Sequence, residues 1–143
     1  MDARVNVITL AVQDLERGLR FYRDGLGFSS GHIVGGEWTD EVTGANGAIA
    51  IFELDGGMTL SLYPRSELAK DAEIPSGPAH GGEFSLAQLV RSRAEVDRLL
   101  HAAEAAGAAV TPAHDRPWGI YSGYFRDPDG HLWEVIHHPS RTP

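Results

Sequence analysis

The chain has 143 residues, of which 42% are hydrophobic and 22% are charged, a composition typical of a globular protein rather than a disordered one. It contains no cysteine, which excludes disulfides, thiol nucleophiles and thiolate-bound metals and is consistent with a cytoplasmic location. A net charge of -8 without a basic cluster argues against nucleic acid as a partner, and the acidic N-terminal residues argue against a signal peptide or a membrane span.

The first predicted elements are a strand and a helix. Residues 4–12 read RVNVITLAV, and this run of β-branched residues predicts a strand. Asp14 can cap a helix that Gly27 ends, and the apolar stripe of that helix consists of Leu15, Leu19, Tyr22 and Leu26. Three further strands are expected at residues 28–34, 48–54 and 58–63, and Asp55-Gly56 between the last two is a hairpin signal.

The same order of elements returns in the second half of the chain. A strand is predicted at residues 84–90, followed by a helix that begins with a capping box of Ser92 and Glu95 and ends at Gly107. Strands are then expected at residues 108–111, 121–125 and 132–137, with a tight turn at Asp127-Pro128-Asp129-Gly130 joining the last two.

The repeated pattern predicts an internal duplication and an α+β fold. One domain, residues 1–143, would contain two βαβββ modules at residues 4–63 and 83–138. Residues 64–82 are polar and rich in proline and glycine, and are interpreted as a linker or a flexible lid. The two mixed sheets are expected to curl into a shared cup with the helices on the outer faces, and a ligand would bind in that cup.

Two segments within this pattern resemble one known superfamily. The stretches VQDLERGLRFYRDGLGF and YFRDPDGHLWEVIHHP are similar to the vicinal-oxygen-chelate superfamily of glyoxalase I, bleomycin-resistance proteins and extradiol dioxygenases. The resemblance covers positions 4–138 and implies a homodimer. It also implies a site in which metal-dependent members hold a divalent ion with four side chains from the first and last strands of each module.

The resemblance places the four metal-ligand positions at Val7, Ser61, Ser85 or its neighbour, and Glu134. Valine cannot bind a metal and a neutral serine is a poor ligand, so Glu134 is the one side chain of a suitable type. We therefore expect no cofactor and no metal. The alternative is a shifted ligand set that uses Asn6 or Gln88, which a β-bulge would have to turn to the correct face.

Glu134 is the strongest candidate for chemistry. Side chains alternate between the two faces of a strand, so Trp133 and Val135 should pack under a helix while Leu132, Glu134 and Ile136 face the cup. A carboxylate among apolar walls could act as a general base or bind a cation. The alternative is a relict carboxylate that is hydrogen-bonded to Ser61, Tyr63 or water.

Aromatic residues are the other candidates for ligand contact. Trp118 and Tyr121 flank a glycine-broken stretch, and Trp38 and Tyr63 are weaker candidates of the same kind, since aromatic rings at a pocket mouth combine apolar area with a polar group. The alternative is that these rings only pack on the protein. The seven histidines form no helical pair with metal-binding spacing.

Two functions follow from these observations. The first is a metal-free protein that binds a small hydrophobic or cationic molecule near Glu134. The second is an enzyme, namely a lyase, isomerase or dioxygenase. It would use either a shifted metal site or Glu134 as a base, with Tyr63 or Tyr121 stabilising an oxyanion or enolate.

Overall fold

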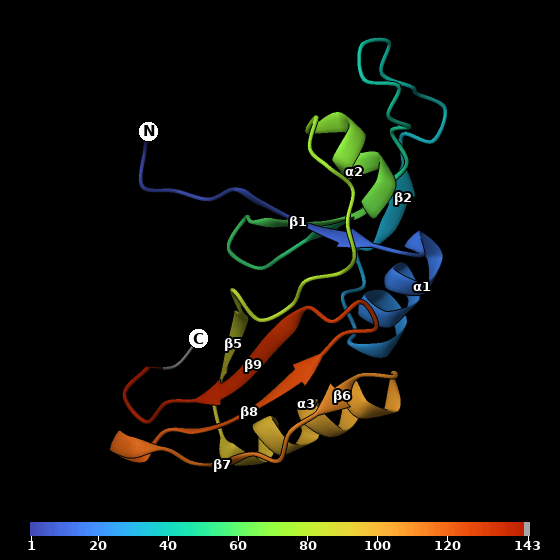
Figure 1. Cartoon of the computed structure of the whole chain (residues 1–143). Helices are drawn as coiled ribbons and strands as arrows, with labels where there is room; N and C mark the ends of the chain where they lie inside the picture. The colour runs from blue at the N-terminus through green and yellow to red at the C-terminus, as the bar shows by residue number, and fades with distance from the viewer. Residues whose placement is uncertain (142–143) are drawn as a thin grey trace. The chain divides into compact units, whose positions relative to one another are not determined.

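The computed structural model describes residues 1–141, and the chain forms two compact units, Met1–Pro78 and Ala79–Pro143. Each unit contains a mixed β-sheet with a helix against one face, so the predicted α+β fold with two mixed sheets is confirmed (Figure 1). None of the helices in the described part of the chain has the length and apolar character needed to cross a membrane.

The sheet of the first unit has the strand order β1-β4-β3-β2. Its strands are β1 (Val7–Val12), β2 (His32–Val34), β3 (Ile49–Glu53) and β4 (Thr59–Pro64). The β1 and β4 strands run parallel, and the other neighbours are antiparallel. All four strands lie within or next to the predicted ranges, and the Asp55-Gly56 hairpin between β3 and β4 is present, with positive φ angles at Gly56 and Gly57.

The first helix, α1 (Leu15–Arg20), begins where the sequence predicts. The carboxylate of Asp14 accepts a hydrogen bond from the backbone N–H of Arg17 at 2.9 Å, which caps the first turn. The helix continues as a π-helix, η1 (Phe21–Gly25), so Phe21 is buried as well as the predicted Tyr22. The α1 helix packs closely on the sheet at Gly18, where a Cβ atom would lie 2.9 Å from Cδ1 of Leu62.

A helix lies where only a linker or lid was predicted. Residues Arg65–Asp71 form α2, which follows β4 directly and packs on β4 and β1. This helix was missed because, apart from Pro64, the prolines and glycines of residues 64–82 lie in the second half of that range, whereas the segment RSELAKD is composed mainly of residues compatible with a helix. The boundary between the two units falls in the same segment, after Pro78.

The sheet of the second unit has the strand order β5-β9-β8-β6, and β7 also pairs with β8. Its strands are β5 (Leu86–Val90), β6 (Ala109–Val110), β7 (His114–Asp115), β8 (Tyr121–Arg126) and β9 (Leu132–His137). The β5 and β9 strands are parallel and β8 and β9 are antiparallel. A short 3-10 helix, η2 (Pro117–Gly119), precedes β8.

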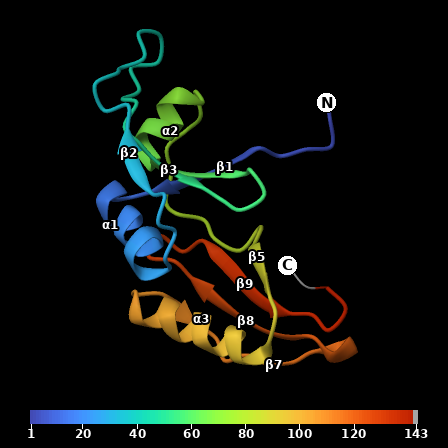
Figure 2. The same ribbon diagram turned by 180° about the vertical axis from the view of Figure 1, so that it is seen from behind.

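The helix α3 (Arg93–Ala105) covers one face of this second sheet, as Figure 2 shows from behind. Its capping box is present, although the Glu95 carboxylate accepts from the backbone N–H of Arg91 (2.7 Å) rather than from that of Ser92. Gly123 of β8 lies under α3, because a Cβ atom there would be 2.6 Å from Cδ1 of Leu100. The residues of β8 and β9 on the same side as Gly123 therefore form the core of this unit.

The turn between β8 and β9 is organised by Asp127. Asp127 is 5% exposed, and its carboxylate accepts hydrogen bonds from the backbone N–H groups of Asp129 and His131 at 3.0 and 2.8 Å. The Nδ1 atom of His131 lies 2.7 Å from its other oxygen. The predicted Asp-Pro-Asp-Gly turn is thus confirmed, with Gly130 at a φ of 90°.

Candidate functional site

Glu134 lies on the face of the second sheet that α3 does not cover. Its neighbours on either side, Trp133 and Val135, are 7% and 2% exposed and face α3, as predicted from strand alternation. The Trp133 ring stacks on Phe125 with 5.9 Å between ring centroids. Glu134 is therefore held on the open face by the packing of its two neighbours, and it is partly exposed there.

Tyr124 is the residue directly across from Glu134. The register pairs Tyr124 of β8 with Glu134 of β9, and Ala87 of β5 lies on the other side of Glu134. Burial raises the pKa of Tyr124 above its usual value, and the charge of Glu134 and a hydrogen bond to it raise that pKa further. The phenol is thereby kept protonated, as a hydrogen-bond donor beside a carboxylate.

Arg116 reaches the same face from the segment before β8. Its guanidinium carbon lies 5.8 Å from the centroid of the Tyr124 ring, within the range of a cation–π contact. A carboxylate, a phenol and a guanidinium thus follow one another across the open face. Tyr124 and Arg116 were not among the predicted site residues.

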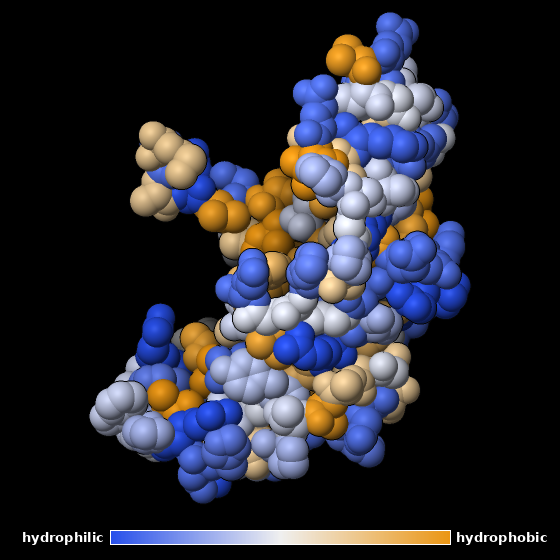
Figure 3. Space-filling view, viewed as in Figure 1, coloured by the Kyte–Doolittle hydropathy of each residue, from blue (hydrophilic) through white to orange (hydrophobic). Residues whose placement is uncertain are grey.

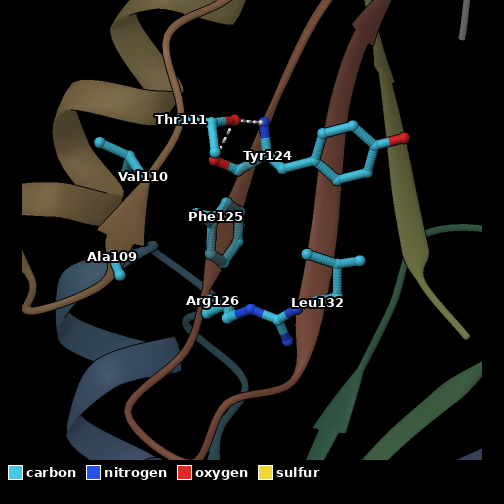
Figure 4. Close-up of a pocket in the computed structure, with 7 residues that line it drawn as sticks. All are labelled: Ala109, Val110, Thr111, Tyr124, Phe125, Arg126 and Leu132. Atoms are coloured by element: carbon cyan, nitrogen blue, oxygen red, sulfur yellow. Dashed lines mark hydrogen bonds between the residues drawn. The ribbon is translucent and has the colours of Figure 1, made fainter. Parts of the chain in front are cut away.

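A hollow of about 340 Å³ adjoins Tyr124 (Figure 4). In this view the Tyr124 ring extends over β9, and Arg126 extends toward Leu132. Thr111 holds the backbone of Tyr124 from the edge of the sheet: its backbone N–H and hydroxyl both donate to the Tyr124 carbonyl, and its hydroxyl oxygen accepts from the Tyr124 N–H. The hollow is lined by Ala109, Val110, Thr111, Tyr124, Phe125, Arg126 and Leu132.

The four positions that the resemblance assigns to metal ligands do not form a suitable donor set. Val7 and Ser61 lie on the face of the first sheet opposite α1, where Val7 is 53% exposed and Ser61 is buried. In the second sheet Ser85 precedes β5, and the β5 residue that pairs with Glu134 is Ala87. Valine, serine and alanine supply no imidazole, carboxylate or thiolate, so the residues present do not fit a divalent ion.

The shifted ligand set fits no better. Gln88 pairs with Val135 and so lies on the face that Val135 shares with α3, and no bulge interrupts the β5–β9 ladder. Asn6 precedes β1, and its backbone oxygen accepts from the N–H of Thr59 at 2.8 Å. Across residues 1–141, no three or more His, Cys, Asp and Glu side chains gather as a metal site would require.

Trp38 and Tyr63 line a second hollow, within the first unit, of about 540 Å³. The Tyr63 hydroxyl donates to the backbone oxygen of Asn46 at 2.6 Å, and burial followed by the nearby charges of Asp71, Glu67 and Asp40 raises its pKa. Trp38 is 69% exposed at the rim. These two predicted contact residues therefore occur together, in the same unit as Ser61.

Trp118 and Tyr121 occupy different surroundings. Tyr121 pairs with Asp115 and lies on the α3 side of the sheet, where its hydroxyl donates to Asp97 at 2.8 Å and Arg93 lies 4.2 Å from its ring centroid. Trp118 sits in η2 with a φ of 64° and is 86% exposed. Tyr121 is thus anchored away from the face that carries Glu134, and Trp118 is a free aromatic ring on the loop that follows Arg116.

Exposed apolar side chains also occur near the N-terminus. Val5 and Val7 are more than half exposed, and Figure 3 shows apolar atoms at the surface beside the N-terminal segment.

Comparison with known proteins gives one family. The model of the Glyoxalase/Bleomycin resistance protein/Dioxygenase superfamily matches residues 4–135. A search of curated proteins finds no match.

Solved structures of glyoxalase-related proteins match nearly the whole chain. A glyoxalase-related enzyme from Fulvimarina pelagi is 32% identical, with a TM-score of 0.76 and coverage of 96% of this chain and 89% of that one. A lactoylglutathione lyase from Agrobacterium tumefaciens is 27% identical, with a TM-score of 0.63 and coverage of 95% and 94%. A glyoxalase/bleomycin resistance protein/dioxygenase from Nocardioides is 23% identical, with a TM-score of 0.71. Its alignment covers 100% of this chain and 89% of that one.

Proposed function

The chain belongs to the glyoxalase/bleomycin resistance/dioxygenase superfamily, and we propose that it binds a small organic molecule beside Glu134 without the help of a divalent metal. The observation that carries this proposal is the pairing of Glu134 with Tyr124 on the uncovered face of the second sheet. The hollow next to Tyr124 offers apolar area, and the carboxylate and phenol offer two hydrogen-bonding groups with different preferences.

The donor set supports the metal-free part of the proposal. Val7, Ser61 and Ser85 stand where the resemblance needs strong ligands, Ala87 is the residue that pairs with Glu134, and Glu134 alone cannot hold a lone divalent ion. We expect purified protein to contain no stoichiometric zinc, nickel, iron or manganese, and we expect chelation to leave ligand affinity unchanged. Elemental analysis that finds one equivalent of a transition metal would contradict this part.

The charge of the ligand group at Glu134 can be tested by substitution. Glu134→Gln keeps the shape of the side chain and removes its charge. If Glu134 binds a cationic or N–H group, the change should weaken affinity by about 1–3 kcal/mol, the scale of a charge-assisted hydrogen bond. Calorimetric titration of both proteins measures this difference, with a small molecule first found to bind the unsubstituted protein in a screen of fragments.

A control separates ligand binding from general damage. Glu104→Gln removes one charge from an exposed position of α3 and should leave both affinity and thermal stability unchanged. If Glu134→Gln also leaves affinity unchanged, Glu134 is a relict carboxylate and the proposed site is wrong.

An enzymatic function is the second candidate, because a carboxylate beside a protonated phenol is an acid–base pair. Glu134 could take a proton from carbon next to a carbonyl while the Tyr124 hydroxyl donates a hydrogen bond to the developing enolate oxygen. Tyr124 replaces Tyr63 and Tyr121 in this role, since those two donate to Asn46 and Asp97. Such an isomerase or lyase would lose about 10²–10⁴-fold in turnover on Glu134→Gln while binding survives.

A further inference from the structure

The hydroxyl of Ser122 is buried without a hydrogen-bond partner. Ser122 is 0% exposed, and its Oγ makes no hydrogen bond within the described residues. It belongs to the open face of the second sheet, because it lies two residues from Tyr124 on β8 and pairs with Ile136 and His114. A hydroxyl that loses water without gaining a partner is destabilising, so this position is suited to an incoming oxygen or nitrogen atom.

Arg116 carries a second buried polar atom that makes no hydrogen bond. Its Nε is also buried and makes no hydrogen bond within residues 1–141, and none of the ion pairs found there uses its guanidinium. An arginine without an anionic partner beside a carboxylate–phenol pair is a cation available to a ligand.

The two atoms lie on one path across the sheet. The backbone N–H of Arg116 donates to the carbonyl of Ile120 at 2.8 Å, so Arg116 starts opposite a residue that precedes Ser122. Its guanidinium ends above Tyr124, which follows Ser122. The Arg116 side chain therefore extends along β8 toward Tyr124, on the face that Ser122 shares.

We propose that Arg116 and Ser122 form a subsite for an anionic oxygen, so that the ligand of the proposed site carries a carboxylate. This inference rests on the proposed function and specifies its ligand class. The guanidinium can bind a carboxylate through two parallel hydrogen bonds, and the Ser122 hydroxyl can donate a third. Because both atoms are closed off from solvent, a carboxylate can reach them only when the side chains that cover them move.

The order of Arg116, Tyr124 and Glu134 on this face indicates which other groups the ligand carries. A molecule with its carboxylate at Arg116 lies along the Tyr124 ring and directs its other end toward Glu134, which accepts an N–H or O–H group. An organic acid that also carries a hydrogen-bond donor satisfies every group on this path. A purely hydrophobic or cationic ligand would leave Arg116 and Ser122 without partners.

The experiment uses two probes that differ in one charge, phenylacetate and phenylacetamide. The Nε–H of arginine is visible in ¹⁵N-resolved NMR spectra, and the Arg116 signal is identified by its loss in Arg116→Gln. We expect phenylacetate to shift this signal and the backbone amides of residues 122–124 in a saturable manner. Phenylacetamide at the same concentration should produce much smaller shifts.

Three variants define the contribution of each group. Arg116→Gln should weaken phenylacetate binding about 10–100-fold, the range expected for loss of a charge-assisted hydrogen bond. Ser122→Ala should weaken binding while leaving the thermal midpoint equal or higher, because a buried hydroxyl without a partner has been removed. Arg98→Gln removes the same charge from the exposed side of α3 and should change neither quantity.

The outcomes separate this inference from the proposed function. If both probes shift residues 122–124 equally, the site exists but the anion subsite is wrong. If neither probe shifts this region, both the subsite and the proposed binding face are overturned. A phenylacetate response that Arg116→Gln leaves intact would likewise overturn the subsite.

Discussion

Among single residues, Tyr124 has a position that follows from the sequence, whereas Arg116 does not. The Asp-Pro-Asp-Gly turn was predicted at residues 127–130, and an antiparallel hairpin closed by that turn pairs Arg126 with Leu132 and therefore Tyr124 with Glu134. The same parity places Tyr121 on the α3 side. Tyr124 could thus have been found by counting outward from the turn, whereas Arg116 could not, because its approach depends on the η2 turn.

The proximity of Glu134 to Tyr124 has a consequence that titration can measure. The pKa of Tyr124 is raised by burial, by the charge of Glu134 and by hydrogen bonding to it, so Tyr124 should ionise only above its usual range near pH 10. Because the folded pKa is above the unfolded one, the associated stability is present below pH 10 and is lost as the pH rises through the folded pKa.

Glu134→Gln should lower the pKa of Tyr124, since it removes the negative charge. The measurement is a pH titration of tyrosine ring carbons by NMR. Tyr121 serves as the internal control, because its pKa is raised by its hydrogen bond to Asp97 and should not respond to Glu134→Gln. An unchanged Tyr124 titration would mean that the two side chains do not interact in solution.

Among the secondary-structure elements, the close packing of α3 on β8 depends on the absence of a side chain at Gly123. A methyl group there would lie 2.6 Å from Cδ1 of Leu100 and 3.1 Å from backbone atoms of Ala113, so either the helix or the segment before β7 would have to move. We expect Gly123→Ala to destabilise the protein by about 1–3 kcal/mol, as overpacking of a core does. Chemical denaturation measures the change.

Gly36→Ala is the matched control for this prediction. The added methyl group would be 3.8 Å from Cβ of Ala48, an ordinary contact, so the free energy of unfolding should stay the same or rise slightly. If Gly123→Ala proves as neutral as Gly36→Ala, α3 packs more loosely on β8 than the structure indicates.

Elements differ in how far local sequence determines them. The α1 and α3 helices were predicted well, because a capping residue, an apolar stripe and a terminal glycine agree in each. The α2 helix was missed because it shares a segment with prolines and glycines. The β5 residue that pairs with Glu134, Ala87, was not predicted, since the register of parallel strands is set by distant contacts rather than by a turn.

At the scale of the whole molecule, the family and the two-sheet architecture follow from the repeated pattern, and assembly remains a prediction. The resemblance implies a homodimer, and the exposed Val5 and Val7, before and at the start of β1, are apolar side chains that an interface could cover. We expect light scattering to give twice the chain mass at micromolar concentration. Val7→Lys should shift the protein toward monomer, whereas Val42→Lys, at an exposed loop position, should not.

The Asp127 turn also bears on how this chain can change in length. Its carboxylate fixes the spacing between β8 and β9, and one added residue between positions 127 and 130 would invert β9, so that Glu134 would point into the core and Val135 outward. The loop at residues 35–47 carries no such constraint on the second sheet. An insertion that the first unit tolerates would thus disrupt the core of the second unit when placed at this turn. The segment that carries the resemblance to the family is therefore the one least free to vary in length.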